Sequence, residues 1–141
     1  MTISMSPYLN FPSGHTRAAM EFYQSIFGGE LVVMGFADFG MPDMPADGVM
    51  HAALNASRFS MYASDAMEGA PDTWQGTRNY ISLMGDEVEE MTGWFNSLAE
   101  GGNVGTALER QVWGDLYGHL TDRYGIEWMF NISDGQGPGS A

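Results

Sequence analysis

The sequence has three histidines, the side chains that most readily change charge near neutral pH, and no cysteine. His51 lies in the segment VMHAAL, whose alternation predicts a strand with Ala53 on the same face. This small neighbour would leave room for a ligand, so His51 could donate a hydrogen bond in a pocket or act as a general base. The alternative is a core or edge histidine whose ring is hydrogen-bonded to a neighbouring strand.

A second group of candidates lies in the dense run RQVWGDLYGHLTDRYGIEWMFNI, residues 110–132. By alternation, Asp115, Tyr117 and His119 share one face of a predicted strand. At roughly 3.3 Å per residue of extended chain, Asp115 and His119 would be about 13 Å apart, too far to bind one metal unless a bulge intervenes. We therefore expect this segment to be mainly scaffold, in which Trp113, Asp115, Tyr117 and His119 form one wall of a pocket.

The charge and composition exclude several classes of function. The chain has 18 acidic residues against five basic ones, all arginine, and a formal net charge of −13. Phosphate backbones and anionic membranes would repel such a protein, so we expect no nucleic-acid and no membrane partner. Without lysine, Schiff-base chemistry is excluded. Without cysteine, disulfides are excluded, and a zinc site would need histidine and carboxylates alone.

The length of 141 residues and the 44% hydrophobic content are typical of one globular domain. No apolar run approaches the roughly 18 residues of a membrane-spanning helix. The first residues show no basic stretch followed by an apolar one, so no signal peptide is predicted. We expect a cytoplasmic protein.

The chain repeats itself. YLNF (8–11) resembles YISL (80–83), and FYQSIFGGEL (22–31) resembles WFNSLAEGGNV (94–104), both at an offset of 72 residues. One inserted residue then aligns the two Gly-Gly pairs. SMYASD (60–65) resembles WMFNISD (128–134), which places Met61 opposite Met129. This order predicts two halves, each with a strand, a helix, a Gly-Gly stop and several further strands.

Two amphipathic helices are predicted, one in each half. Apolar side chains at i, i+3, i+4, i+7 and i+8 predict a helix over residues 19–27 that ends at Gly28 in the left-handed conformation. The second helix is expected to begin with a capping box of Asp86 and Glu89 and to continue to Gly101.

Two connecting segments are also predicted. Residues 38–48, rich in Pro, Asp and Gly, form a loop whose Met41 and Met44 suit a lid or a dimer contact. In TDRYG (121–125), Asp122 and Gly125 fit a tight turn between two strands, where Asp122 bonds its own backbone.

Several motifs in order resemble one known family: PYLNF, AAMEFYQSIFGGEL, VMHAAL, SMYASD and WGDLYGHLTDRYGIEWMFNI. They resemble the vicinal oxygen chelate superfamily, which includes glyoxalase I, extradiol dioxygenases and bleomycin-resistance proteins, and more closely its PhnB-like branch. The methyltransferase label attached to members of that branch finds no support, because no Gly-rich Rossmann nucleotide loop is visible.

The resemblance implies an α+β fold of two βαβββ modules whose curved mixed sheets form a cleft. The modules would span about residues 5–66 and 78–134. Together they would form a single domain over residues 1–134, followed by a flexible tail over residues 135–141.

The resemblance also implies where a divalent metal would bind. Enzymes of this superfamily hold it with four inward side chains from the first and last strands of the modules. Carried over residue by residue, these positions are Met61, Tyr80, Met129 and either Ser6 or Tyr8. Thioether, hydroxyl and neutral phenol groups are poor ligands for such a metal, so we expect neither a metal nor another cofactor. Glu127 with His51 is the best remaining pair for a metal or for acid–base catalysis.

The leading hypothesis is a homodimeric protein that binds a small organic molecule in a metal-free cleft. The expected pocket residues are Tyr8, His51, Met61, Tyr80, Trp113, Asp115, His119 and Met129. One alternative is a lyase, isomerase or dioxygenase that uses His51 and Glu127, with or without a metal. Another is a resistance protein that sequesters an antibiotic. Fold analogy does not choose between them.

Overall fold

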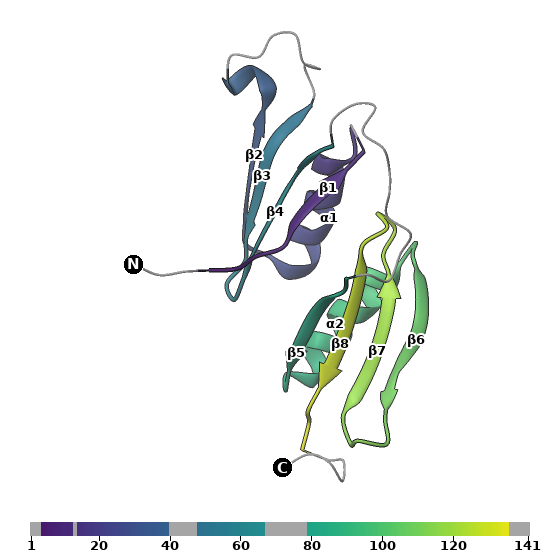
Figure 1. Ribbon diagram of the computed structural model, residues 1–141. Helices are drawn as coiled ribbons and strands as arrows, with labels where there is room; N and C mark the ends of the chain where they lie inside the picture. Colours follow the sequence, from purple (N-terminus) through teal and green to yellow (C-terminus); the bar gives the residue numbers. More distant parts are fainter. Residues whose placement is uncertain (1–3, 13, 40–47, 67–78, 136–141) are drawn as a thin grey trace. The chain divides into compact units, whose positions relative to one another are not determined.

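A computed structural model describes residues 4–12, 14–39, 48–66 and 79–135. It divides the chain into two compact units, residues 1–73 and 74–141. Each unit contains one four-stranded mixed sheet and one α-helix in the order βαβββ (Figure 1). The predicted α+β class with two βαβββ modules is therefore confirmed. The cleft and the single-domain arrangement over residues 1–134 stay predictions, and residues 40–47 and 136–141 lie outside the described part.

In the first unit the sheet has the strand order β1-β4-β3-β2, and only β1 and β4 are parallel. A short 3-10 helix, η1, follows the second strand (Figure 1). The elements are β1 (Tyr8–Phe11), α1 (Thr16–Phe27), β2 (Glu30–Gly35), η1 (Phe36–Phe39), β3 (Val49–Asn55) and β4 (Ser60–Asp65).

The second unit repeats this topology with the order β5-β8-β7-β6, in which only β5 and β8 are parallel. Its elements are β5 (Ile81–Gly85), α2 (Val88–Ala99), β6 (Asn103–Arg110), β7 (Leu116–Thr121) and β8 (Glu127–Ile132). None of the helices in the described ranges is long and apolar enough to cross a membrane.

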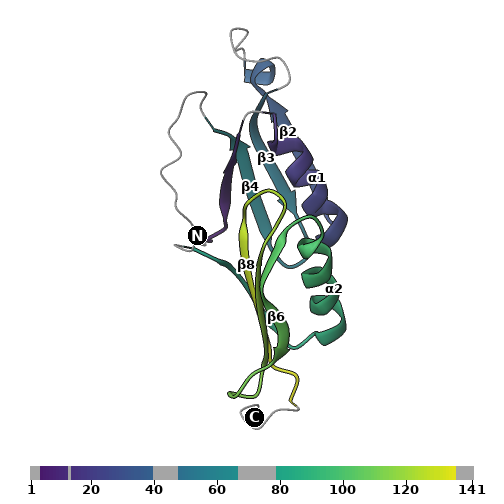
Figure 2. The same cartoon turned by 90° about the vertical axis from the view of Figure 1, so that its right-hand side faces the viewer.

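Each helix lies against one face of its own sheet, and the core of each unit lies between them (Figure 2). Because side chains alternate along a strand, every second strand residue faces the helix. The buried side chains include Met20, Tyr23, Leu54, Met61 and Ala63 in the first unit, and Phe95, Leu98, Leu120, Trp128, Phe130 and Ile132 in the second.

The other face of each sheet, which its own helix does not cover, is called the helix-free face below. Strand alternation and pairing place on it Tyr8, His51, Ala53 and Tyr62 in the first unit, and Ser82, Tyr117, His119, Glu127, Met129 and Asn131 in the second.

The two helices confirm the predicted repeat, because both have 12 residues and start 72 positions apart. Gly28 ends α1 with φ 73° as expected, but its ψ of −165° lies outside the left-handed helical region. The prediction of a capping box at the start of α2 is wrong. The N-cap of α2 is Glu87, one residue later than the box requires, and no side chain caps this end.

The two Gly-Gly pairs fix the alignment of the strands. A Cβ on Gly29 would lie 2.3 Å from the Asn55 carbonyl oxygen, and a Cβ on Gly102 would lie 2.3 Å from that of Thr121. Each second glycine thus lets the chain leaving the helix pass against the end of the third strand of its unit. Asn55 and Thr121 therefore occupy equivalent positions.

This alignment corrects the predicted match between Met61 and Met129. Ser60 pairs with Asn55, and Glu127 pairs with Thr121, so the last strands start at these two residues. The connection between β7 and β8 is one residue longer than that between β3 and β4. Counting from the strand starts, Met129 is equivalent to Tyr62, not to Met61.

Candidate functional site

The helix-free face of the first unit carries a cluster of three rings, Tyr8, His51 and Tyr62, which we call the ring cluster. The Tyr8 hydroxyl lies 3.2 Å from Nδ1 of His51. The ring centroids are 5.7 Å apart for His51 and Tyr62, 5.8 Å for Tyr8 and His51, and 6.4 Å for Tyr8 and Tyr62. The structure therefore brings together two of the predicted pocket residues and adds Tyr62.

Strand pairing explains why these three residues meet. Tyr8 of β1 lies directly beside Tyr62 of β4, and Tyr62 lies opposite Ala53 of β3. His51 is two residues before Ala53, so it points to the same face. Tyr62 was not predicted, because Met61 was expected at this place on β4. The alternation of buried Met61 and Ala63 was the signal in the sequence that could have found it.

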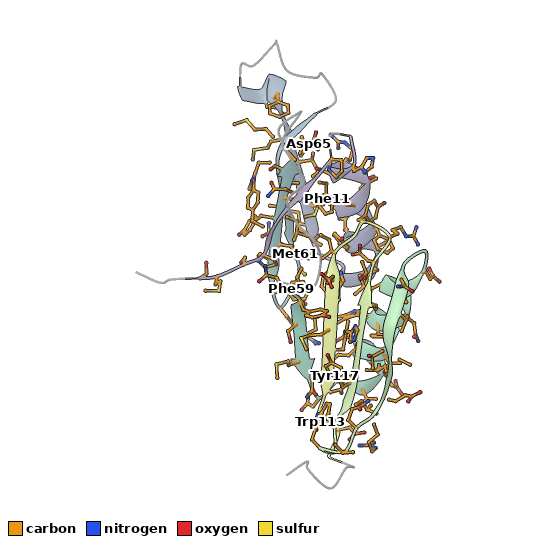
Figure 3. The ribbon with its side chains drawn as sticks, turned by 45° about the vertical axis from the view of Figure 1, so that its right-hand side comes forward. Phe11, Phe59, Met61, Asp65, Trp113 and Tyr117 are labelled. Carbon is orange, nitrogen blue, oxygen red and sulfur yellow. The ribbon has the colours of Figure 1, made fainter. Side chains whose placement is uncertain are left out.

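Met61 does not join this cluster. It is only 1% exposed and lies opposite Leu54 on the face that packs against α1. Figure 3 marks its place within the first unit. Ser6 precedes β1 and is half-buried.

The helix-free face of the second unit holds His119 among aromatic rings. Its Nε2 lies 2.9 Å from the Thr106 hydroxyl, and its ring centroid is 5.6 Å from Tyr80 and 6.1 Å from Tyr117. His119 is also the direct pairing partner of Met129 on β8. The structure thus brings together three of the predicted pocket residues in the second unit: His119 and Met129 on its sheet, and Tyr80 just before β5.

Gly105 and two irregularities in β6 set the position of the His119 ring. The β6–β7 register shifts between Val104 and Thr106 and again before Glu109, which brings Thr106 opposite His119. A Cβ on Gly105 would lie 2.3 Å from Cε1 of His119, so the imidazole occupies space that only glycine leaves. Thr106 was not predicted, since bulges of this kind leave no regular pattern in the sequence.

Asp115 acts on Trp113 through a hydrogen-bonded chain. The Asn131 amide donates to Asp115 (2.9 Å), and the Trp113 indole donates to the Asn131 oxygen (3.2 Å). The Ser133 hydroxyl donates to the other oxygen of Asp115 (2.9 Å). Trp113 then packs edge-on against Tyr117 at 5.7 Å (Figure 3). Asp115 therefore holds Asn131 in place, and through it the Trp113 indole.

Two further charged side chains of the second unit are Arg110, which ties Asp134 and the Gly114 carbonyl together, and Glu127. Arg110 makes two hydrogen bonds to Asp134 and one to the Gly114 carbonyl, and the bond to Asp134 raises the arginine pKa. Glu127 starts β8 opposite Thr121. Since His51 belongs to the first unit and Glu127 to the second, their action as a pair stays a prediction.

Comparison with known proteins decides the family. The model of the glyoxalase/bleomycin resistance protein/dioxygenase superfamily matches residues 6–130. The chain belongs to this superfamily. The match covers most of the chain and confirms the resemblance read from the sequence motifs.

The chain is similar in sequence to curated proteins and in structure to solved ones. Protein YjdN of Escherichia coli is 29% identical, with 91% of this chain and 94% of YjdN aligned. The crystal structure of PA1353 from Pseudomonas aeruginosa is 37% identical with a TM-score of 0.77, over 93% of this chain and 98% of that one. A PhnB protein from Bacillus cereus has a TM-score of 0.75 at 22% identity, over 92% and 99% of the two chains, and shows the shared fold alone.

The divalent metal that the superfamily resemblance implies does not fit the donor groups of this member. On the helix-free faces, the first and last strands carry Tyr8 beside Tyr62, and Ser82 beside Met129, while the predicted ligand position Tyr80 comes just before β5. These paired groups are neutral oxygen and sulfur donors, whereas such metals prefer imidazole and carboxylate. Glu127 adds a single carboxylate on the same face of β8. Within the described ranges, no group of three or more His, Cys, Asp or Glu side chains could hold a metal ion.

Proposed function

We propose that this protein binds a small planar organic molecule without a metal. One observation carries the proposal: on the helix-free faces, the first and last strands pair Tyr8 with Tyr62 and Ser82 with Met129, and Glu127 is the one carboxylate that the described residues of these strands place there. A metal-dependent member would need imidazole or carboxylate groups at such positions. Within the first unit, the phenol rings of Tyr8 and Tyr62 instead offer contact surface to a flat organic ligand.

The exposure of the rings supports the same proposal. Tyr8 is 49% exposed and Trp113 is 47% exposed, although both are large and partly apolar. Both also have their polar atoms engaged, by His51 and by Asn131. When a flat ligand covers such a ring, apolar surface is removed from water, and this lowers the free energy of the complex.

Metal content tests the metal-free part of the proposal. The protein is produced in medium supplemented with Mn, Fe, Ni and Zn, then analysed by elemental mass spectrometry and by thermal denaturation with and without a chelator. We expect far less than one metal per chain and no change of Tm with the chelator. One metal per chain, lost with a fall in Tm, would favour the enzyme that uses a metal.

Ligand retention tests the binding part. Gentle native mass spectrometry of the purified protein, followed by mass spectrometry of its organic extract, should reveal a retained small molecule. The double variant Tyr8→Ala/Tyr62→Ala should lose that molecule, whereas Val112→Ala, at a 95% exposed position, should keep it. Equal retention by both variants would contradict the role of the ring cluster. An intact antibiotic in the extract would identify drug sequestration as the function.

The same mass spectrum tests the assembly. We propose a homodimer, as the superfamily resemblance implies. A dimer mass supports this, and a monomer at micromolar concentration contradicts it.

A further inference from the structure

We infer that His51 is the polar recognition group of a site for a phenol, a flat aromatic ring that carries a neutral hydroxyl. The inference rests on the proposed function and adds the ligand class and the recognising atom, Nε2 of His51. The site uses the ring cluster of the first unit alone.

The geometry of the ring cluster suits a flat ligand. The three planes are inclined to one another by 21° to 32°, so the rings are nearly parallel. In a column of three stacked rings, the outer two would be about twice as far apart as neighbours. Here the three centroid separations are similar, between 5.7 and 6.4 Å. The rings therefore form a cluster with a broad aromatic surface, which favours stacking of another ring.

His51 has one ring nitrogen left for a ligand. Its Nδ1 is engaged by the Tyr8 hydroxyl, and Nε2 has no hydrogen-bond partner among the residues that the structure describes. Neutral imidazole carries one donor and one acceptor nitrogen, so Tyr8 fixes the ring and Nε2 serves the ligand. Ala53, opposite Tyr62 on the same face, contributes only a methyl group there, and Met34 of β2 pairs with His51.

The charges near the site favour a neutral hydroxyl over a carboxylate or a phosphate. The sequence has no lysine and a net charge of −13. The two arginines in the described part of the first unit lie elsewhere in the chain: Arg17 on α1, and Arg58 in the turn between β3 and β4. An anion would therefore lack a nearby cation on the strands that carry the cluster. A phenol needs only the single hydrogen bond that Nε2 provides.

Two ligands that differ in the hydroxyl alone test the inference. 4-Methylphenol carries the group and stays neutral near pH 7, and 4-methylanisole replaces its hydroxyl proton by a methyl group. Imidazole ¹⁵N NMR spectra can be assigned with His15→Gln, His51→Gln and His119→Gln, because the chain has three histidines. We expect 4-methylphenol to shift the Nε2 signal of His51 and to leave those of His15 and His119 in place. We expect it to bind about fivefold more tightly than 4-methylanisole, as one hydrogen bond provides.

Variants separate recognition from positioning. His51→Phe keeps a ring but removes both nitrogens, so 4-methylphenol should bind it only as well as 4-methylanisole does. The affinity for 4-methylanisole should stay near that of the original protein. Tyr8→Phe should reduce the preference and change the tautomer signals of His51. His15→Gln, at an exposed position before α1, is the matched control and should change neither affinity. If His51→Phe does not fold, His51→Gln takes its place in the affinity measurements. If neither variant folds, the ¹⁵N spectra of the original protein with the two ligands decide.

The outcomes distinguish this inference from the proposed function. A response of His119 instead of His51, or an unchanged preference in the His51 variants, overturns the inference. So does a retained organic molecule in a protein that binds neither 4-methylphenol nor 4-methylanisole, which would leave the proposed function intact. If nothing is retained and neither compound binds, both fail.

Discussion

Asp122 shows how a carboxylate that could do chemistry is used entirely by the structure. It is 3% exposed and accepts hydrogen bonds from the backbone of Tyr124 and Ile126, at 2.8 and 3.2 Å. This confirms the predicted turn. Its second oxygen accepts from the indole of the buried Trp128 at 2.8 Å, which no local sequence pattern indicated. Asp122 thus ties the β7–β8 turn to the core of the second unit.

Replacing this residue should be costly. Asp122→Ala leaves three donors without their acceptor, one of them on a fully buried tryptophan, and should lower the free energy of unfolding by about 3 kcal/mol. Urea denaturation measures the change. Asp86→Ala is the control, because Asp86 is exposed and does not cap α2, so it should stay within about 0.5 kcal/mol. Similar losses in both variants would contradict this account.

Gly105 offers a second test at the level of one residue. Gly105→Ala should push the His119 ring off the Thr106 hydroxyl and cost about 1–2 kcal/mol. The matched control is Gly93→Ala, within α2, where a Cβ meets nothing within 4 Å and should stabilise by about 0.5–1 kcal/mol. Urea denaturation gives both values, and an unchanged ¹⁵N signal of His119 in Gly105→Ala would refute the contact.

At the scale of elements, periodicity predicted most of the fold. The apolar stripe of each helix and the alternation of the strands were readable, since burial on one face imposes them. The match of Met61 with Met129 failed because one connection is a single residue longer, and a shift of one residue moves a side chain to the other face of the sheet. Contacts made across strands, such as Thr106 with His119, depend on bulges that sequence patterns do not reveal.

Substitutions in the Gly-Gly pair after α1 test how the helix is joined to the sheet. Both glycines have positive φ, 73° for Gly28 and 95° for Gly29, so alanine is strained at either position by about 1–3 kcal/mol. Only Gly29→Ala also places a Cβ against the backbone of β3. Its loss of stability should therefore exceed that of Gly28→Ala by at least about 1 kcal/mol, measured by chemical denaturation. Equal losses would mean that strain alone matters there.

At the scale of the whole molecule, charge dominates the expected response to salt. With a net charge of −13, the excess acidic side chains repel one another in the folded chain. Raising NaCl from about 10 mM to about 1 M shortens the screening length to roughly 3 Å and weakens this repulsion. Tm should rise by a few degrees, as differential scanning calorimetry would show. Salt weakens the Arg110–Asp134 ion pair, so Arg110→Ala should show a larger rise than the original protein. A fall of Tm in salt would contradict the dominance of repulsion.

The separation of the two sheet faces has a consequence for how this protein can change over generations. The side chains that hold each unit together face its helix, whereas the ring cluster lies on the other face. Substitutions at positions 8, 51, 53 and 62 therefore leave the helix-facing core in place. If the ring cluster binds the ligand proposed above, these are the positions at which selection can change the ligand preference while the chain keeps folding. The same scaffold would then be a starting point for laboratory evolution.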